Sequence, residues 1–272
     1  MSANTTAYLV LVAVPSSAGP PLLAAGTAGV PRSGQRTFAA PYFEFEYGVN
    51  GWWTSEAYIE GQSTAGDSAV FTGWRFENRF HVLRREHFIN PVLYFEYENL
   101  NEADKIMKEI EGHDVEADHA VPNATLRQGH NHELELKLLL SSTHNGWNFA
   151  VNPLATKPLT GGEPWEFGYA MGVSRPLALK ASAQRCSLCL ENFVAGVEMY
   201  GGLGDRPSFG LHDTSHYLAP VLAWNLPSSW TLRLSPGFGL NDNSHQFLLR
   251  WGLSREFSGF GSTLARLFGG GQ

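Results

Sequence analysis

The sequence contains no apolar run long enough to cross a bilayer as a helix. Within its 272 residues, no stretch approaches the ~20 consecutive apolar residues that a spanning helix requires. Charged residues make up only 17% of the chain, which is low for a soluble protein of this size. Acidic residues outnumber basic ones by 26 to 19, and no basic stripe interleaved with aromatic residues is present. This composition argues against a nucleic-acid partner.

Alternation between aromatic and charged side chains is the most informative pattern in the chain. Near its start, Phe43, Phe45 and Tyr47 alternate with Glu44 and Glu46. Successive side chains of a β-strand point to opposite faces, so one face of this strand is apolar and the other carries carboxylates. Such a strand suits the wall of a barrel in a lipid bilayer, with one face toward lipid and the other toward the interior.

The same alternation recurs along the chain, and the cleanest example places Glu133, Glu135 and Lys137 between leucines. The backbone N–H and C=O groups of an open sheet edge find no hydrogen-bond partners in hydrocarbon, so a membrane protein without spanning helices must be a closed barrel. The sequence therefore predicts an all-β fold, an antiparallel transmembrane β-barrel of about 12 strands.

Turn residues divide the chain into eleven identifiable strands. These are residues 37–47, 52–62, 69–82, 91–99, 132–141, 147–154, 165–174, 190–200, 215–225, 230–240 and 245–256. Bacterial single-chain barrels have even strand numbers. Either a twelfth strand lies in the first 35 residues or within 176–185, or the chain has lost an amino-terminal strand, and we favour the twelve-stranded design. An apolar run followed by small residues resembles an export signal without its basic start. The predicted organisation is a signal-like or linker segment (1–35), a β-barrel domain (36–257) and a C-terminal tail (258–272).

Three short connections are each followed at once by a tryptophan, namely Trp52, Trp147 and Trp230. Tryptophan prefers the headgroup level of a membrane, so these turns are expected at one interface, on the periplasmic side. Longer polar connections, expected on the outer side, lie at 63–68, 99–131, 156–164, 201–214 and 241–244. Apolar residues within 101–112 have helical spacing and are followed by a glycine, which is compatible with a short helix in the longest outer loop.

The polar faces of the strands predict a set of charged residues that line the lumen. The set is Glu44, Glu46, Glu56, Glu60, Arg75, Glu77, Arg79, Glu96, Glu98, Glu133, Glu135, Lys137, Glu166, Glu198, Arg233 and Arg250. Excess carboxylates lining a channel favour cations and repel anions. A second interpretation stays open, because a paired charge network can plug a small barrel. Wide aqueous channels need about 16 strands, which favours a narrow pore or a plug over an open porin.

Cys186 and Cys189 are the only cysteines of the chain. A c-type haem needs histidine directly after this pair, but Leu190 stands there, so haem attachment is excluded. Zinc would need two further ligands close by in the sequence. In the oxidising periplasm we expect a local disulfide between the two cysteines, in preference to a metal or redox role.

Two other segments contain residue types that take part in chemistry. Histidines and acidic residues in 113–119, with His130 and His132 after them, match no established metal site, and a solvated acidic loop explains them. Residues 212–216 contain the serine and histidine used by lipid-hydrolysing barrels, but Ser215 and His216 are adjacent and face opposite ways on a strand. We therefore predict no catalytic residue, no metal site, no cofactor and no enzymatic activity.

Five segments carry a resemblance to a known family. They are PYFEFEYGVNGWWTSEAYIEGQ, FINPVLYFEYE, HELELKLLLSS, PWEFGYAMGVSRPLAL and SHYLAPVLAWNL. Over roughly residues 37–257 the chain resembles an uncharacterised family of bacterial outer-membrane β-barrel proteins. The resemblance implies a location in the bacterial outer membrane, in contact with its lipid, and implies no reaction.

Fold, lumen charge and resemblance together give one functional expectation. We expect a narrow cation-preferring pore or porin-like transport protein for small ions or solutes, of unknown substrate. The alternatives are a plugged structural or partner-binding barrel and, behind it, a lipid-modifying barrel enzyme.

Overall fold

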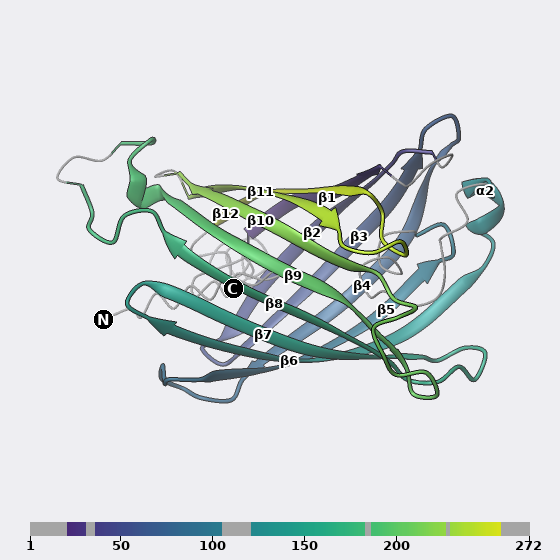
Figure 1. Cartoon of the computed structure of the whole chain (residues 1–272), viewed down its shortest axis with the longest axis horizontal. Coiled ribbons are helices and arrows are strands. Elements are labelled where there is room, and N and C mark those ends of the chain that lie inside the picture. Colours follow the sequence, from purple (N-terminus) through teal and green to yellow (C-terminus); the bar gives the residue numbers. More distant parts are fainter. Residues whose placement is uncertain (1–20, 31–35, 105–120, 183–185, 227–228, 257–272) are drawn as a thin grey trace, which may run out of the picture.

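The alternating segments form β-strands in the computed structural model, which describes residues 21–30, 36–104, 121–182, 186–226 and 229–256. The strands are β1 (Pro21–Val30), β2 (Phe38–Asn50), β3 (Trp53–Thr64), β4 (Ala69–His81), β5 (Asn90–Asn101), β6 (His130–His144), β7 (Trp147–Pro158), β8 (Glu166–Pro176), β9 (Phe193–Asp205), β10 (His216–Asn225), β11 (Trp230–Gly239) and β12 (Phe247–Glu256). Each strand pairs antiparallel with the next, and β1 pairs with β12, so the sheet closes into a barrel (Figure 1). The predicted fold class is confirmed.

Strand β1 is the twelfth strand that the even-number rule required. It pairs with β12 from Pro21 opposite Glu256 to Val30 opposite Phe247, and on its other edge it pairs with β2. Among the described residues the barrel begins at Pro21, so its first strand lies before the predicted domain boundary at residue 36. The expectations for residues 1–20 and for the tail after Glu256 lie outside the described residues.

The described parts of the connections contain two short helical segments, α2 (Asn123–Leu126) between β5 and β6 and η1 (Leu190–Asn192) before β9. Helix α2 lies in the longest loop, outside the predicted helical segment 101–112. Of that segment, residues 101–104 belong to the end of β5 and a turn, and the rest is outside the described residues. Among the described helices, neither has the length and apolar character needed to cross a membrane.

The connections alternate between the two ends of the barrel. One end, called the turn end, carries the β2–β3, β4–β5, β6–β7, β8–β9 and β10–β11 connections, and the other, the loop end, carries the remaining ones and α2. Trp52, Trp147 and Trp230 thus share the turn end, as predicted. The β6–β7 hairpin has positive φ at Asn145 (50°) and Gly146 (80°), the type I′ geometry that an Asn-Gly pair adopts readily.

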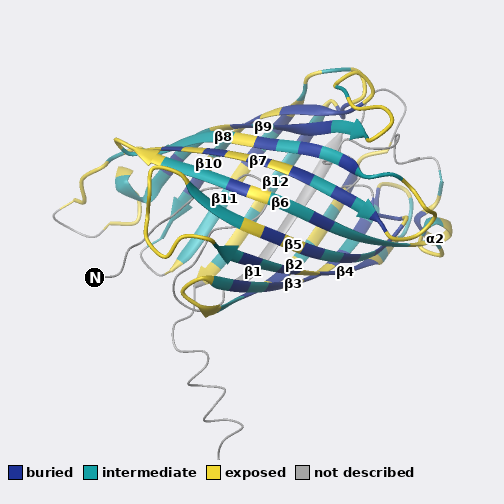
Figure 2. Ribbon diagram, turned by 90° about the horizontal axis from the view of Figure 1, so that it is seen from below, coloured by how far each residue is buried: buried dark blue, intermediate teal, exposed yellow. Residues whose placement is uncertain are grey.

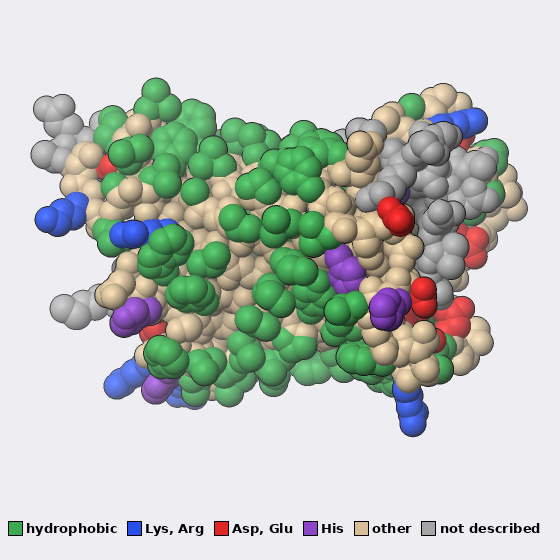
Figure 3. Space-filling view, in the orientation of Figure 1, with side chains coloured by type: hydrophobic (Ala, Val, Ile, Leu, Met, Phe, Trp, Pro, Cys, Tyr) green, Lys and Arg blue, Asp and Glu red, His purple; other side chains and the backbone are tan. Residues whose placement is uncertain are grey.

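Apolar side chains cover the outside of the barrel. Exposed large hydrophobic residues occur on every strand from β2 to β12, as with Phe43, which is 61% exposed. Figure 3 shows hydrophobic side chains over the middle of one face, with charged and histidine side chains toward the two ends. An apolar band between polar rims is the exterior of a barrel that stands in lipid.

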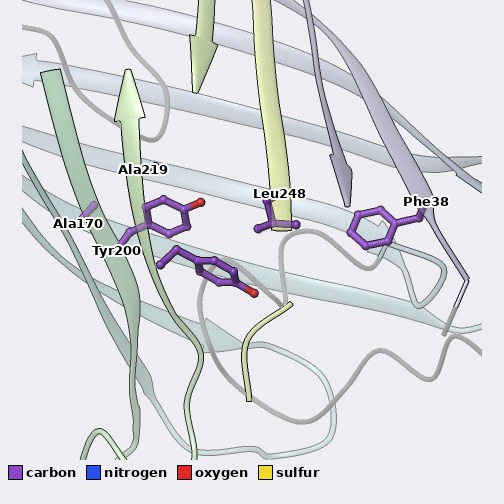
Figure 4. Close-up of a cluster of buried hydrophobic side chains, with 6 residues drawn as sticks. Phe38, Ala170, Tyr200, Ala219 and Leu248 are labelled. Atoms are coloured by element: carbon purple, nitrogen blue, oxygen red, sulfur yellow. The ribbon is translucent and has the colours of Figure 1, made fainter. Parts of the chain in front are cut away.

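The inward-facing side chains fill the lumen in layers. Figure 2 shows buried and exposed residues alternating along the strands. Near the loop end, a cluster of buried side chains comes from five strands around the wall (Figure 4): Phe38, Ala170, Tyr200, Tyr217, Ala219 and Leu248. Near the turn end, a smaller cluster contains Tyr94, Leu139 and Ala150.

Candidate functional site

The candidate site is the charged inner surface of β2 to β6, which we call the acidic wall. In these five strands, all of them described, it consists of nine glutamates and three bases: Glu44, Glu46, Glu56, Glu60, Glu77, Glu96, Glu98, Glu133, Glu135, Arg75, Arg79 and Lys137. Eight of the glutamates are buried, and Glu133 is half-buried. On the same strands, the residues between them include exposed hydrophobic side chains such as Phe43, Ile59 and Phe76.

A β-bulge brings the β4 residues into this wall. The register of β3 and β4 pairs Glu60 with Gly73 and Gly61 with Phe71, so Thr72 is an extra residue on β4. The extra residue reverses which alternate positions face inward, and it places Arg75 and the two charged residues after it in the lumen. Gly73 has φ of 153°, and a Cβ atom there would lie 2.0 Å from the Asn99 carbonyl oxygen, so only glycine fits.

The strand register aligns five glutamates in a row across the wall, which we call the glutamate row. Glu46 is opposite Glu56, Glu56 opposite Glu77, Glu77 opposite Glu96, and Glu96 opposite Glu135. Directly opposed like charges destabilise a sheet, so such a row persists only with compensation from neighbouring groups. The compensating groups are bases and tyrosines on the adjacent inward positions.

Arg75 compensates the part of the wall toward the loop end. Its Nη1 lies 2.7 Å from Oε1 of Glu96, and its Nε donates to Glu60. The guanidinium also stacks 4.3 Å from the centre of the Tyr58 ring. A planar guanidinium can serve two carboxylates and an aromatic face together, which a point charge cannot do.

Arg79 compensates the middle of the glutamate row. Its Nη2 lies 2.7 Å from Oε2 of Glu56, and its Nε donates to Glu77. The Tyr58 hydroxyl lies 2.5 Å from Glu56 Oε2 and 2.8 Å from Glu77 Oε2, so it bridges the same two carboxylates. Tyr58 was missed as a site residue, although alternation already places it on the face of Glu56 and Glu60.

Lys137 is the third base of the wall. It forms an ion pair with Glu135, and its ammonium lies 4.4 Å from the centre of the Tyr94 ring. The Tyr94 hydroxyl donates to Glu96. Glu98 is the exception, since it is 1% exposed and its Oε1 has no hydrogen-bond partner among the described residues.

The opposite side of the lumen has the reverse charge balance. There Glu198 on β9 lies between two arginines, 2.7 Å from Arg233 on β11 and 2.9 Å from Arg250 on β12. We call these three residues the arginine face. Arg250 also stacks 4.3 Å from the centre of the Tyr200 ring, whereas the Arg233 side chain is 26% exposed.

A small cavity adjoins the arginine face. Its volume is about 20 Å³, and glycine, alanine and serine residues line it beside Glu198 and Arg233. This volume is close to what one water molecule needs. The last predicted lumen residue, Glu166, is buried at the start of β8, near the loop end.

Loop β3–β4 is tied to α2 at the loop end. The backbone N–H groups of Asn123 and Ser68 donate to the Asp67 carboxylate at 2.7 and 2.6 Å. These hydrogen bonds lower the pKa of Asp67 below its ordinary value. The Asn123 side chain also donates to the Ser68 carbonyl at 2.7 Å, so α2 is held against the β3–β4 loop.

The cysteines form a disulfide at the turn end. Cys186 and Cys189 are bonded with their Cα atoms 5.4 Å apart, in the connection between β8 and β9. The Asn192 side chain donates to the Cys186 carbonyl at 2.6 Å. Both cysteine sulfurs are therefore used in a disulfide that closes a short loop.

The two histidine segments give no assembled site within the described residues. His216 has partners on both ring nitrogens: Tyr169 at 3.1 Å on Nδ1, and Thr214 at 3.1 Å on Nε2. His132 is hydrogen-bonded to the Tyr97 hydroxyl at 2.7 Å, and His130 begins β6. Residues 113–119 lie outside the described residues.

Comparisons with known proteins agree on the fold. No protein-family model and no curated protein matches this chain. The solved structure of the KdgM porin in complex with a disordered oligogalacturonate has a TM-score of 0.54, with 7% identity, covering 87% of this chain and 99% of that one. An outer-membrane channel from Pseudomonas putida F1 has a TM-score of 0.55, with 11% identity, covering 94% and 100%. The chain thus has the fold of outer-membrane β-barrels, and its apolar exterior fits that membrane.

Proposed function

We propose that this porin-like outer-membrane barrel is a narrow pore that prefers cations. The observation that carries the proposal is the acidic wall, in which nine inward-facing glutamates share three bases. Charges of one sign lining a confined lumen with low-dielectric walls concentrate ions of the opposite sign. Rings of carboxylates select cations in known channels by this means.

The charge of the wall also bears on the class of solute. The KdgM porin binds an oligogalacturonate, which is a chain of negatively charged sugars. An acidic wall repels such a polyanion, so that ligand does not carry over to this barrel. Small inorganic cations are the solutes that the acidic wall suits best.

The width of the lumen supports a narrow pore over a wide one. A barrel of this strand number lies below the ~16 strands typical of wide aqueous channels. Tyr58, Tyr94, Tyr200 and Tyr217 are each at most 1% exposed, so large side chains occupy the interior. The same packing favours the second candidate, a plugged barrel that acts as a scaffold or binds a partner.

An enzymatic role has less support. A hydrolase of the barrel type needs a histidine free to take a proton from a serine. Both ring nitrogens of His216 have hydrogen-bond partners other than a serine, namely Tyr169 and Thr214. We therefore propose a non-enzymatic barrel.

Planar-bilayer recording of the purified chain tests the proposal. Reversal potentials across a KCl gradient should show cation preference. The preference should weaken as salt rises, because the Debye length falls from ~10 Å at 0.1 M to ~3 Å at 1 M. Anion preference would contradict the assignment of the acidic wall. Absence of conductance from protein shown to be inserted would favour the plugged barrel instead.

A further inference from the structure

We propose that the acidic wall holds a hard divalent cation, such as Ca²⁺ or Mg²⁺, between Glu96, Glu98 and Glu135. The inference deepens the proposed function, on which it rests for the entry of cations into the lumen. The binding itself can be measured without any ion flow.

Three carboxylates converge at this point of the wall. Glu96, Glu98 and Glu135 each offer an oxygen atom, and these oxygens all lie within 4.8 Å of one another. The strand register explains the convergence, because Glu96 is directly opposite Glu135 on β6, and Glu98 is the next inward-facing residue of β5. Carboxylate oxygens from a rigid sheet are the ligand type that hard divalent cations prefer.

Glu98 gives an independent reason to place a cation here. It is 1% exposed, and its Oε1 has no hydrogen-bond partner within the described part of the chain. No ion pair joins Glu98 to any described base, whereas Glu96 contacts Arg75 and Glu135 contacts Lys137. A buried carboxylate oxygen without a hydrogen bond or an ion-pair contact is expensive, and a metal ion bound to it removes that cost.

The second group of converging carboxylates does not need an added ion. Glu44, Glu46 and Glu56 also have oxygens within 4.8 Å of one another. There Arg79 lies among them, 2.7 Å from Glu56 and 3.9 Å from Glu46. A guanidinium thus already stands where the cation would be. The comparison between the two groups provides a matched control for the test.

The site was not predicted from the sequence, which indicated no metal. Metal-binding motifs are recognised by the spacing of ligands along the chain. Here Glu96 and Glu98 are two residues apart, and Glu135 is on another strand, so only the register unites them.

The test is calorimetric titration of CaCl₂ into the full chain, purified in detergent and washed with EDTA. The wild-type barrel should bind one Ca²⁺. Glu98→Gln should weaken binding by roughly tenfold or more, since even indirect partners of a metal contribute about 10- to 100-fold to its affinity. Glu44→Gln should retain the binding, and so should Glu86→Gln, which removes an exposed carboxylate between β4 and β5. Heat-modifiable gel mobility checks that each variant is folded, and Glu98→Asp supplies a second variant if Glu98→Gln is not.

Three outcomes would overturn the inference. They are no Ca²⁺ binding to the wild type at millimolar concentration, unchanged binding in Glu98→Gln, and equal loss in Glu44→Gln and Glu98→Gln. The last would mean that the wall attracts cations diffusely, without a site. Reversal potentials in KCl with a chelator present separate this inference from the proposed function. Cation preference without Ca²⁺ binding refutes the site alone, and Ca²⁺ binding without cation preference refutes the pore alone.

Discussion

The two sides of the lumen have opposite imbalances between carboxylates and bases. On the acidic wall, one arginine must serve several carboxylates, as Arg79 does for Glu56 and Glu77. On the arginine face, one carboxylate serves two arginines, with Glu198 between Arg233 and Arg250. The acidic wall is buried except for the half-buried Glu133 and packs against Tyr58 and Tyr94, whereas the arginine face borders a small cavity and is partly exposed.

If the barrel is the cation-preferring pore proposed above, the local charge balance of each side, more than the net charge of the chain, determines its ion preference. The chain as a whole has a net charge of -7. The excess of glutamates on the acidic wall is of similar size, so most of the imbalance is concentrated on one side of a narrow tube. Confinement between low-dielectric walls then strengthens the field of these charges over that of the same charges at a surface.

The largest difference in free energy of unfolding should appear between two single substitutions, each of which removes an arginine from one side of the lumen. Arg79→Met leaves Glu46, Glu56 and Glu77 buried without their shared base, and breaking such a buried pair costs about 3–5 kcal/mol. Arg233→Met should cost roughly 1 kcal/mol or less, because the side chain is partly exposed and Glu198 keeps Arg250 at 2.9 Å. Denaturant unfolding in lipid vesicles measures both free energies. Equal destabilisation by the two substitutions would remove the distinction between the two sides.

A second pair of variants tests which face of β6 points toward lipid and which toward the lumen. Leu136→Arg puts a charge on the outer surface of β6 and should destabilise the barrel by about 2–4 kcal/mol if it lies near mid-membrane. Glu135→Gln, one residue away on the inner surface, should affect unfolding less and should change Lys137 pairing and ion preference more. The same unfolding measurement applies. Similar tolerance at both positions would contradict the inner and outer assignment on which the comparison depends.

Most of the barrel could be predicted because its strands alternate strongly. Glu133, Glu135 and Lys137 between leucines leave only one orientation for β6 in a membrane. Strand β1 could not be identified, since PLLAAGTAGV has no charged residue and little contrast between alternate positions. The place of β1 is set by its pairing with β12, which is distant in the sequence, and with β2, which follows it after a connection.

The inward direction of the lumen residues was also predictable, but their partners were not. Alternation puts Glu77 and Arg79 inside, yet it does not tell which residue on the next strand lies opposite. The bulge at Thr72 shifts the β3–β4 register by one residue, and the glutamate row exists only with that shift. The lack of a hydrogen-bond partner for Glu98 Oε1 among the described residues likewise depends on Arg75 and Lys137 contacting other carboxylates.

The measurement that tests the central claim most directly compares reversal potentials of two double variants in the same KCl gradient. One is Glu77→Gln with Glu98→Gln on the acidic wall, and the other is Arg233→Gln with Arg250→Gln on the arginine face. If the acidic wall sets the ion preference, the first variant should lose cation preference and the second should keep or increase it. An unchanged reversal potential in the first variant, or shifts of the same sign in both, would contradict the account.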